Sequence, residues 1–97
     1  MKRELAFTPL AMADIERAFK WYEEQRSGLG IEFETAVGRM LDLIREMPEV
    51  APVAHRDLRR LLLPRFPYAI YYRVADKIEI RGCLHLRRAP GVWRRRA

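Results

Sequence analysis

The chain of 97 residues is long enough for one domain and too short for two, and its composition, 49% hydrophobic and 33% charged, is that of a globular protein. The longest apolar runs fall short of a membrane span, and one cysteine with two histidines excludes a disulfide framework and a zinc site, so we expect no metal and no other cofactor. The formal net charge of +6 is unevenly divided, because residues 1–50 carry seven Lys or Arg against ten Asp or Glu, whereas residues 51–97 carry twelve against three.

The first half of the chain predicts a short strand followed by a helical hairpin. Leu5 and Phe7 alternate with charged or small neighbours, which is the pattern of a half-buried strand. Thr8 as N-cap and Pro9 at the first helical position predict a helix from about Pro9 to Arg26. After the break at residues 27–30, a second helix is predicted that ends before position 48. The expected inward stripes are Ile15, Ala18, Phe19 and Tyr22, then Phe33, Val37, Met40, Leu41 and Ile44.

The second half predicts strands. Residues 48–57 have no clear period and contain two prolines, so we expect a loop there. Strands are expected over 59–63, 68–74 and 78–86. Strict alternation places one set of side chains of the last strand against the helices and the other on an open, charged face. The inward set is Ile78, Ile80, Gly82, Leu84 and Leu86, and the outward set is Glu79, Arg81, Cys83, His85 and Arg87.

These elements give the order β-α-α-β-β-β, an α+β domain over residues 1–97 whose helical hairpin packs on one face of a mainly antiparallel sheet. The other face is expected to be basic and open. Because 16 of the 19 cations are arginine, which suits bidentate contacts with phosphate or carboxylate, the charge indicates a polyanionic or acidic partner. The N-terminal sequence shows no apolar signal core, so we expect a cytoplasmic protein that binds no membrane.

This order of elements resembles the RelE/ParE superfamily of bacterial toxins, and two stretches support the resemblance. Phe66-Pro67-Tyr68 opens a strand that continues as IYYRV, and the chain ends in a His-x-x-Arg-x-Pro-x-x-Trp-x-x-Arg pattern. The residues of that ending are His85, Arg88, Pro90, Trp93 and Arg96.

The resemblance implies the toxin of a type II toxin-antitoxin pair, a growth inhibitor of the kind associated with plasmid stabilisation. A cognate antitoxin with an acidic, partly disordered C-terminal segment is the implied partner, and no small-molecule substrate is implied. ParE-like members act on DNA gyrase and are not known as nucleases, whereas RelE-like members cleave mRNA on the ribosome. We favour the ParE-like branch, and the alternative is a ribosome-dependent, metal-independent mRNA endonuclease.

The residue chemistry bears on this choice. RelE-like sites use lysines on the sheet face and a C-terminal tyrosine or histidine, but the three lysines of this chain are not expected on that face and Trp93 cannot act as an acid. A catalytic set can still be drawn from His85 as acid or base with Arg59, Arg73 and Arg88 as phosphate clamps. A lone histidine more commonly orders the last strand or the tail by hydrogen bonding, and that interpretation of His85 stays open beside the catalytic one.

A larger group of residues is expected to bind the target or the antitoxin. Arginines of this kind are also consistent with a solvated sheet face, and Trp93 with a hydrophobic anchor for the tail. A plain nucleic-acid-binding module would account for the charge but not for an apolar group such as Trp21. The candidates are Trp21, Arg60, Tyr71, Arg81, Arg87, Trp93, Arg94, Arg95 and Arg96.

Overall fold

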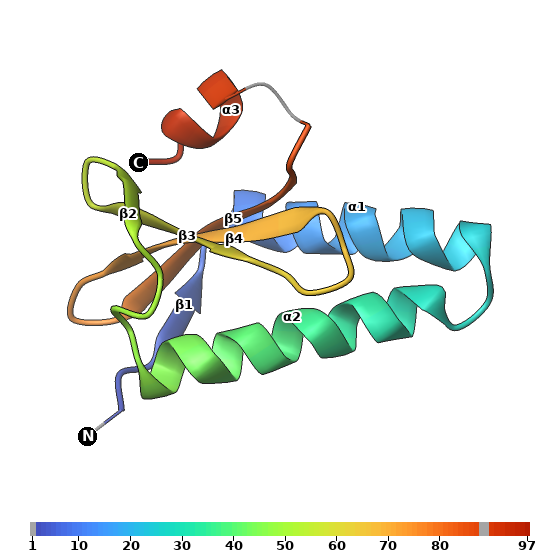
Figure 1. Ribbon diagram of the computed structural model, residues 1–97, viewed down its shortest axis with the longest axis horizontal. Coiled ribbons are helices and arrows are strands. Elements are labelled where there is room, and N and C mark those ends of the chain that lie inside the picture. Colours follow the sequence, from blue (N-terminus) through green and yellow to red (C-terminus); the bar gives the residue numbers. More distant parts are fainter. Residues whose placement is uncertain (1, 88–89) are drawn as a thin grey trace.

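A computed structural model describes residues 2–87 and 90–97 and shows a five-stranded sheet with two long helices on one of its faces (Figure 1). The strand order is β1-β5-β4-β3-β2, with β1 parallel to β5 and all other neighbours antiparallel. The predicted α+β class is confirmed. The elements are β1 (Leu5–Phe7), α1 (Pro9–Gln25), α2 (Leu29–Glu46), β2 (Val53–His55), β3 (Leu58–Leu62), β4 (Tyr68–Val74), β5 (Ile78–His85) and α3 (Pro90–Arg94).

The helical hairpin has the predicted start and a close crossing. The Thr8 hydroxyl accepts a hydrogen bond from the Ala11 amide at 3.1 Å, as an N-cap does. Gly30 lies where α2 approaches α1, because a Cβ at this position would stand 2.7 Å from the Phe19 carbonyl oxygen. The Glu23 carboxylate accepts the Gly30 amide at 2.8 Å and so caps the second helix from the first. None of the helices in the described part of the chain is long and apolar enough to cross a membrane.

The main core lies between this hairpin and the sheet. Its aromatic centre is formed by Tyr22 of α1, Phe33 of α2 and Phe66 of the β3–β4 turn, with ring centroids 5.0–5.4 Å apart. Ile70 and Ile80, both fully buried, continue it along the sheet. Burial of each such side chain contributes about 1.5–3 kcal/mol, so the packing of the hairpin on the sheet holds the fold together.

A bulge in β5 corrects the predicted alternation of that strand. Tyr71 pairs with Gly82 and Tyr72 with Ile80, so Arg81 has no partner opposite it and the faces exchange beyond it. Cys83, expected on the open face, is therefore buried in the core beneath the helices, and Leu84 points to the opposite face. His85, expected on the open face too, lies on the helix side beside Tyr68, at a ring distance of 5.2 Å.

The expectation of an open face opposite the helices was also wrong. A second, smaller cluster on that face joins Leu58, Ala69, Tyr71 and Leu84, each at most 4% exposed. The C-terminal residues Val92, Trp93 and Ala97 pack against it, and Figure 1 shows α3 on the side of the sheet away from α2. Part of the predicted loop over 48–57 instead forms β2, which pairs with β3 at the sheet edge.

Candidate functional site

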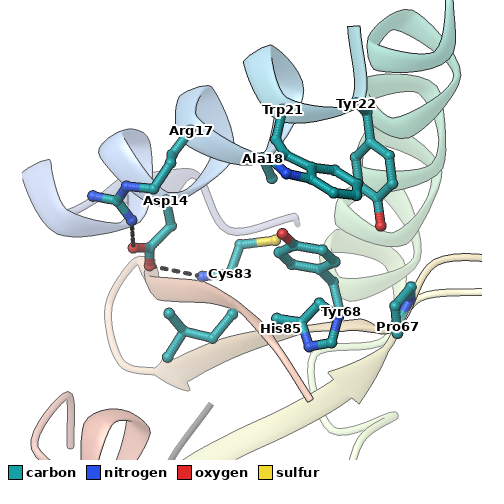
Figure 2. A pocket seen from close by; sticks show the side chains of 10 residues that line it. Asp14, Arg17, Ala18, Trp21, Tyr22, Pro67, Tyr68, Cys83 and His85 are labelled. Atoms are coloured by element: carbon teal, nitrogen blue, oxygen red, sulfur yellow. Dashed lines mark hydrogen bonds and ion pairs between the residues drawn. The ribbon is translucent and has the colours of Figure 1, made fainter. Parts of the chain in front are cut away.

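A groove of about 430 Å³ runs between α1 and the β5 side of the sheet, and we call it the α1–β5 groove. Figure 2 shows Trp21 and Tyr22 hanging from α1 over one side, with Tyr68 and His85 facing them from the sheet. Trp21 is 54% exposed, and its ring stands edge-on to that of Tyr22 at 5.1 Å. The lining residues are Asp14, Arg17, Ala18, Trp21 and Tyr22 of α1, with Pro67, Tyr68, Cys83, Leu84 and His85 of the sheet side.

The groove is bordered by a strand edge. In the described chain, β1 covers the outer edge of β5 only from Ile78 to Ile80. Because the Leu86 amide donates to the Pro67 carbonyl at 2.8 Å, the backbone groups of Cys83 and His85 point away from β4, toward this edge. An extended peptide laid in the groove would therefore meet backbone donors and acceptors on one side and an apolar wall on the other.

Asp14 closes part of that edge, and we call its contact with Arg96 the clasp. Its buried carboxylate accepts the Cys83 amide at 3.1 Å and Arg96 Nη1 at 2.8 Å. The same Nη1 atom donates to the Arg81 carbonyl at 2.8 Å. A Cβ on Gly82 would stand 2.8 Å from Arg96 Nη1, so the absence of a side chain at this glycine allows the guanidinium to reach Asp14. Burial, with Asp14 adding a smaller effect, raises the pKa of Cys83 to about 12.

Cations gather on the opposite side of the sheet. Trp93 stacks on Tyr71 with ring centroids 5.5 Å apart and an interplanar angle of 15°. The guanidinium carbons of Arg60 and Arg94 lie 6.0 and 5.5 Å from the Trp93 ring, within the range of cation–π contact. Arg95 follows on the same short segment and is exposed. This surface joins β3 to the C-terminus, although the two segments are far apart in the sequence.

The structure separates the residues of the predicted catalytic set. His85 lies in the α1–β5 groove, where its Nδ1 accepts the Arg87 amide at 3.0 Å. Arg59 of β3 lies opposite Tyr72, near the other end of β4, and donates to the Ala51 carbonyl at 2.7 Å. Arg73 pairs with acidic side chains of neighbouring turns and strands, and Arg88 lies outside the described residues. No three His, Cys, Asp or Glu side chains gather as a metal site within 2–87 and 90–97.

The predicted binding residues divide between the two sides of the sheet and the interior. Trp21 belongs to the groove, whereas Arg60, Trp93 and Arg94 lie on the opposite side of the sheet, above the buried Tyr71. Arg87 and Arg95 are exposed. Two further candidates are engaged internally: Arg81 pairs with Glu79 at 3.2 Å, and Arg96 with Asp14 in the clasp.

Sequence reasoning missed Asp14. A signal was present, because Asp14 is spaced with Ala11, Ala18 and Tyr22 on one face of α1. The structure buries all four of these residues. A carboxylate on an apolar stripe requires a buried partner, but the sequence alone does not identify it.

Comparisons with known proteins give one family match and one solved structure with a similar fold. A family model described as the ParE toxin of the type II toxin-antitoxin system, parDE, matches residues 5–90. Among solved structures, the chain is similar to one described as the chromosomal ParDE TA system from P. aeruginosa, with a TM-score of 0.65 and 21% sequence identity. That alignment covers 87% of this chain and 96% of the other, and at this identity it concerns the fold. None of the curated proteins matches the chain.

Proposed function

The chain belongs to the ParE toxin family of type II toxin-antitoxin systems, and from that premise we propose that it inhibits DNA gyrase by binding and that a cognate antitoxin holds it inactive. The observation that carries the proposal is the α1–β5 groove, an apolar channel of about 430 Å³ beside an incompletely covered strand edge. Such a groove suits capture by a peptide segment, since it combines backbone pairing with pockets for side chains.

The antitoxin segment we propose is acidic and disordered before it binds. Exposed Trp21 offers an aromatic anchor, and Arg17 lines the same groove with a side chain 61% exposed. The formal charge of +6 on the toxin would speed the approach of an acidic segment. Folding of the segment onto the groove would then add apolar contacts, which is the usual behaviour of disordered binders.

Inhibition by binding, rather than by RNA cleavage, is supported by the positions of the candidate catalytic residues. His85 lies on the helix side of the sheet, and Arg59 and Arg73 lie toward the opposite end of β4. Both arginines are engaged by other groups of the chain. A general acid or base and a phosphate clamp need to converge within hydrogen-bond reach of one substrate, and these three side chains do not.

Induced expression in bacteria tests the target. Gyrase inhibition predicts filamentation and DNA-damage signalling while mRNA stays intact, and the variant His85→Ala keeps that phenotype. Rapid translation arrest with mRNA cut at codon positions, abolished by His85→Ala, would instead establish the RelE-like endonuclease and overturn the proposal.

The antitoxin part is tested with the short acidic protein that we expect to be encoded beside the gene of this chain. Trp21→Glu should weaken its binding about tenfold or more, because an aromatic anchor is replaced by a charge. Met12→Glu is the matched control, since Met12 is exposed on α1 outside the groove. Equal affinities for the two variants would place the antitoxin elsewhere, and the lack of an adjacent acidic partner gene would argue against the toxin role.

A further inference from the structure

We propose that Arg60, Trp93 and Arg94 form a binding surface for the phosphodiester backbone of a nucleic acid. We call these three residues the cationic surface. The proposal goes beyond gyrase inhibition and antitoxin binding, and it does not depend on which protein is the target. Its starting point is that β3 and α3 bring two guanidinium groups within 6.0 Å of one tryptophan ring.

The cations of this surface are available to an anion. Arg60 and Arg94 are exposed, and within the described chain no carboxylate pairs with either of them. Acidic residues of the sheet are already engaged, because Glu79 pairs with both Arg73 and Arg81. A phosphate arriving here would therefore not have to displace an internal acid.

The surroundings favour a nucleic acid over an acidic protein. Protein interfaces need an apolar, desolvated centre, whereas nucleic-acid interfaces are more polar and far more positively charged. The apolar cluster on this side of the sheet is covered by the C-terminal segment, with Leu58, Ala69, Tyr71 and Leu84 at most 4% exposed. Leu62, on the same face of β3, is 52% exposed and lies outside this cluster. The apolar anchor suited to a protein, Trp21, lies in the groove on the other side.

The surface is also held in shape. Stacking on Tyr71 fixes the Trp93 ring, and the clasp fixes the end of the C-terminal segment through Arg96. Through Arg96, Asp14 therefore holds the end of the segment that carries Arg94. Arginine prefers fixed, bidentate phosphate contacts, so this ordering lowers the entropy lost on binding.

Fluorescence anisotropy with a short labelled DNA duplex and a single-stranded RNA, measured over a salt series, tests the proposal. The double variant Arg60→Gln/Arg94→Gln should lose about tenfold or more in affinity. The slope of log K against log salt concentration should also become shallower by about 2, because each phosphate contact contributes roughly 0.9 to this slope for duplex DNA. The control Arg39→Gln/Arg45→Gln removes the same charge from exposed positions of α2 and should change the salt dependence much less. Binding of either nucleic acid that the double variant weakens in this way supports the proposed surface. The relative affinities for the duplex and the single strand show which of the two it prefers.

A second variant distinguishes an ordered surface from diffuse electrostatic attraction, because the two predict opposite changes in affinity for the nucleic acid. Asp14→Asn makes the chain more positive, so diffuse attraction predicts tighter binding. The proposal predicts weaker binding, by about threefold or more, since the clasp no longer holds α3 in place. Circular dichroism verifies that the variant is folded.

Three outcomes would overturn the proposal. The first is no measurable binding to either nucleic acid at low salt. The second is an equal loss in the α2 control, or unchanged or tighter binding by Asp14→Asn. The third is that poly-glutamate displaces the nucleic acid at the same charge concentration, which would mark the surface as one for an acidic protein.

Discussion

Replacing Arg96 with methionine should reveal how much of the stability depends on the clasp. The side chains of Asp14 and Arg96 are 3% and 13% exposed, so the variant leaves a buried carboxylate without its closest cation. Breaking a buried ion pair by removing one partner costs about 3–5 kcal/mol. Asp14 keeps the Cys83 amide at 3.1 Å and the mostly exposed Arg17 at 3.5 Å, which offset part of this loss. We therefore expect Arg96→Met to lower the free energy of unfolding by about 2–3 kcal/mol.

Urea unfolding followed by circular dichroism measures this loss, and Gly82→Ala provides the internal check. A Cβ on Gly82 would stand 2.8 Å from Arg96 Nη1, so alanine should push the guanidinium off the clasp. Gly82→Ala should lower the free energy of unfolding strongly in the wild-type background and hardly at all in the Arg96→Met background. Substitutions of residues in direct contact are non-additive in this way. An unfolding free energy of Arg96→Met within about 0.5 kcal/mol of wild type, the usual range of surface substitutions, would contradict a stabilising clasp. An equal destabilisation by Gly82→Ala in both backgrounds would contradict it as well.

Three further predictions concern the body of the fold. Gly30→Ala should destabilise by about 1–3 kcal/mol in thermal or urea unfolding, because its Cβ would stand 2.7 Å from a carbonyl oxygen of α1; a neutral effect would contradict the close crossing. Cys83 should resist iodoacetamide at pH 8 in the folded protein and react when unfolded, since burial raises its pKa from 9.0 to about 12. The folded state holds that proton more tightly, so its contribution to stability is present below about pH 9 and is lost as the pH rises toward 12; fast labelling of the native protein would refute this. Tyr72→Phe should cost about 1 kcal/mol in urea unfolding, because its hydroxyl donates to the Pro48 carbonyl at 2.8 Å, and an unchanged midpoint would argue against that bond.

The helical hairpin and the last three strands were predictable because their signals are local. Thr8 and Pro9 determine where α1 begins, and alternation over Tyr68–Val74 matches β4 residue for residue. The resemblance to the RelE/ParE superfamily was confirmed by the family match over residues 5–90. These features depend on neighbours within a few positions, which a single sequence displays directly.

The faces of β5 were not predictable in the same way. A single extra residue at Arg81 moves Cys83 and His85 to the other side of the sheet, and nothing in a two-residue period indicates where a bulge will fall. The short α3 and its packing on Tyr71 escaped prediction as well, because a helix of this length is specified by the surface it covers.

The candidate site was predictable only in its ingredients. Arginine excess and Trp93 pointed to a cationic surface, but its membership depended on contacts between β3 and α3. The clasp joins residues 82 positions apart, Asp14 and Arg96, so the sequence predicts Arg96 only as a binding residue and does not reveal its ion pair within the fold. Long-range ion pairs of this kind become visible only once the topology is known.

A supercoiling assay with purified toxin and DNA gyrase is the most direct test of the account. Relaxed plasmid is incubated with gyrase, ATP and rising amounts of the chain, beside the His85→Ala variant. Both proteins should block supercoiling to the same extent. Full gyrase activity in the presence of excess toxin, or inhibition that His85→Ala abolishes, would contradict it.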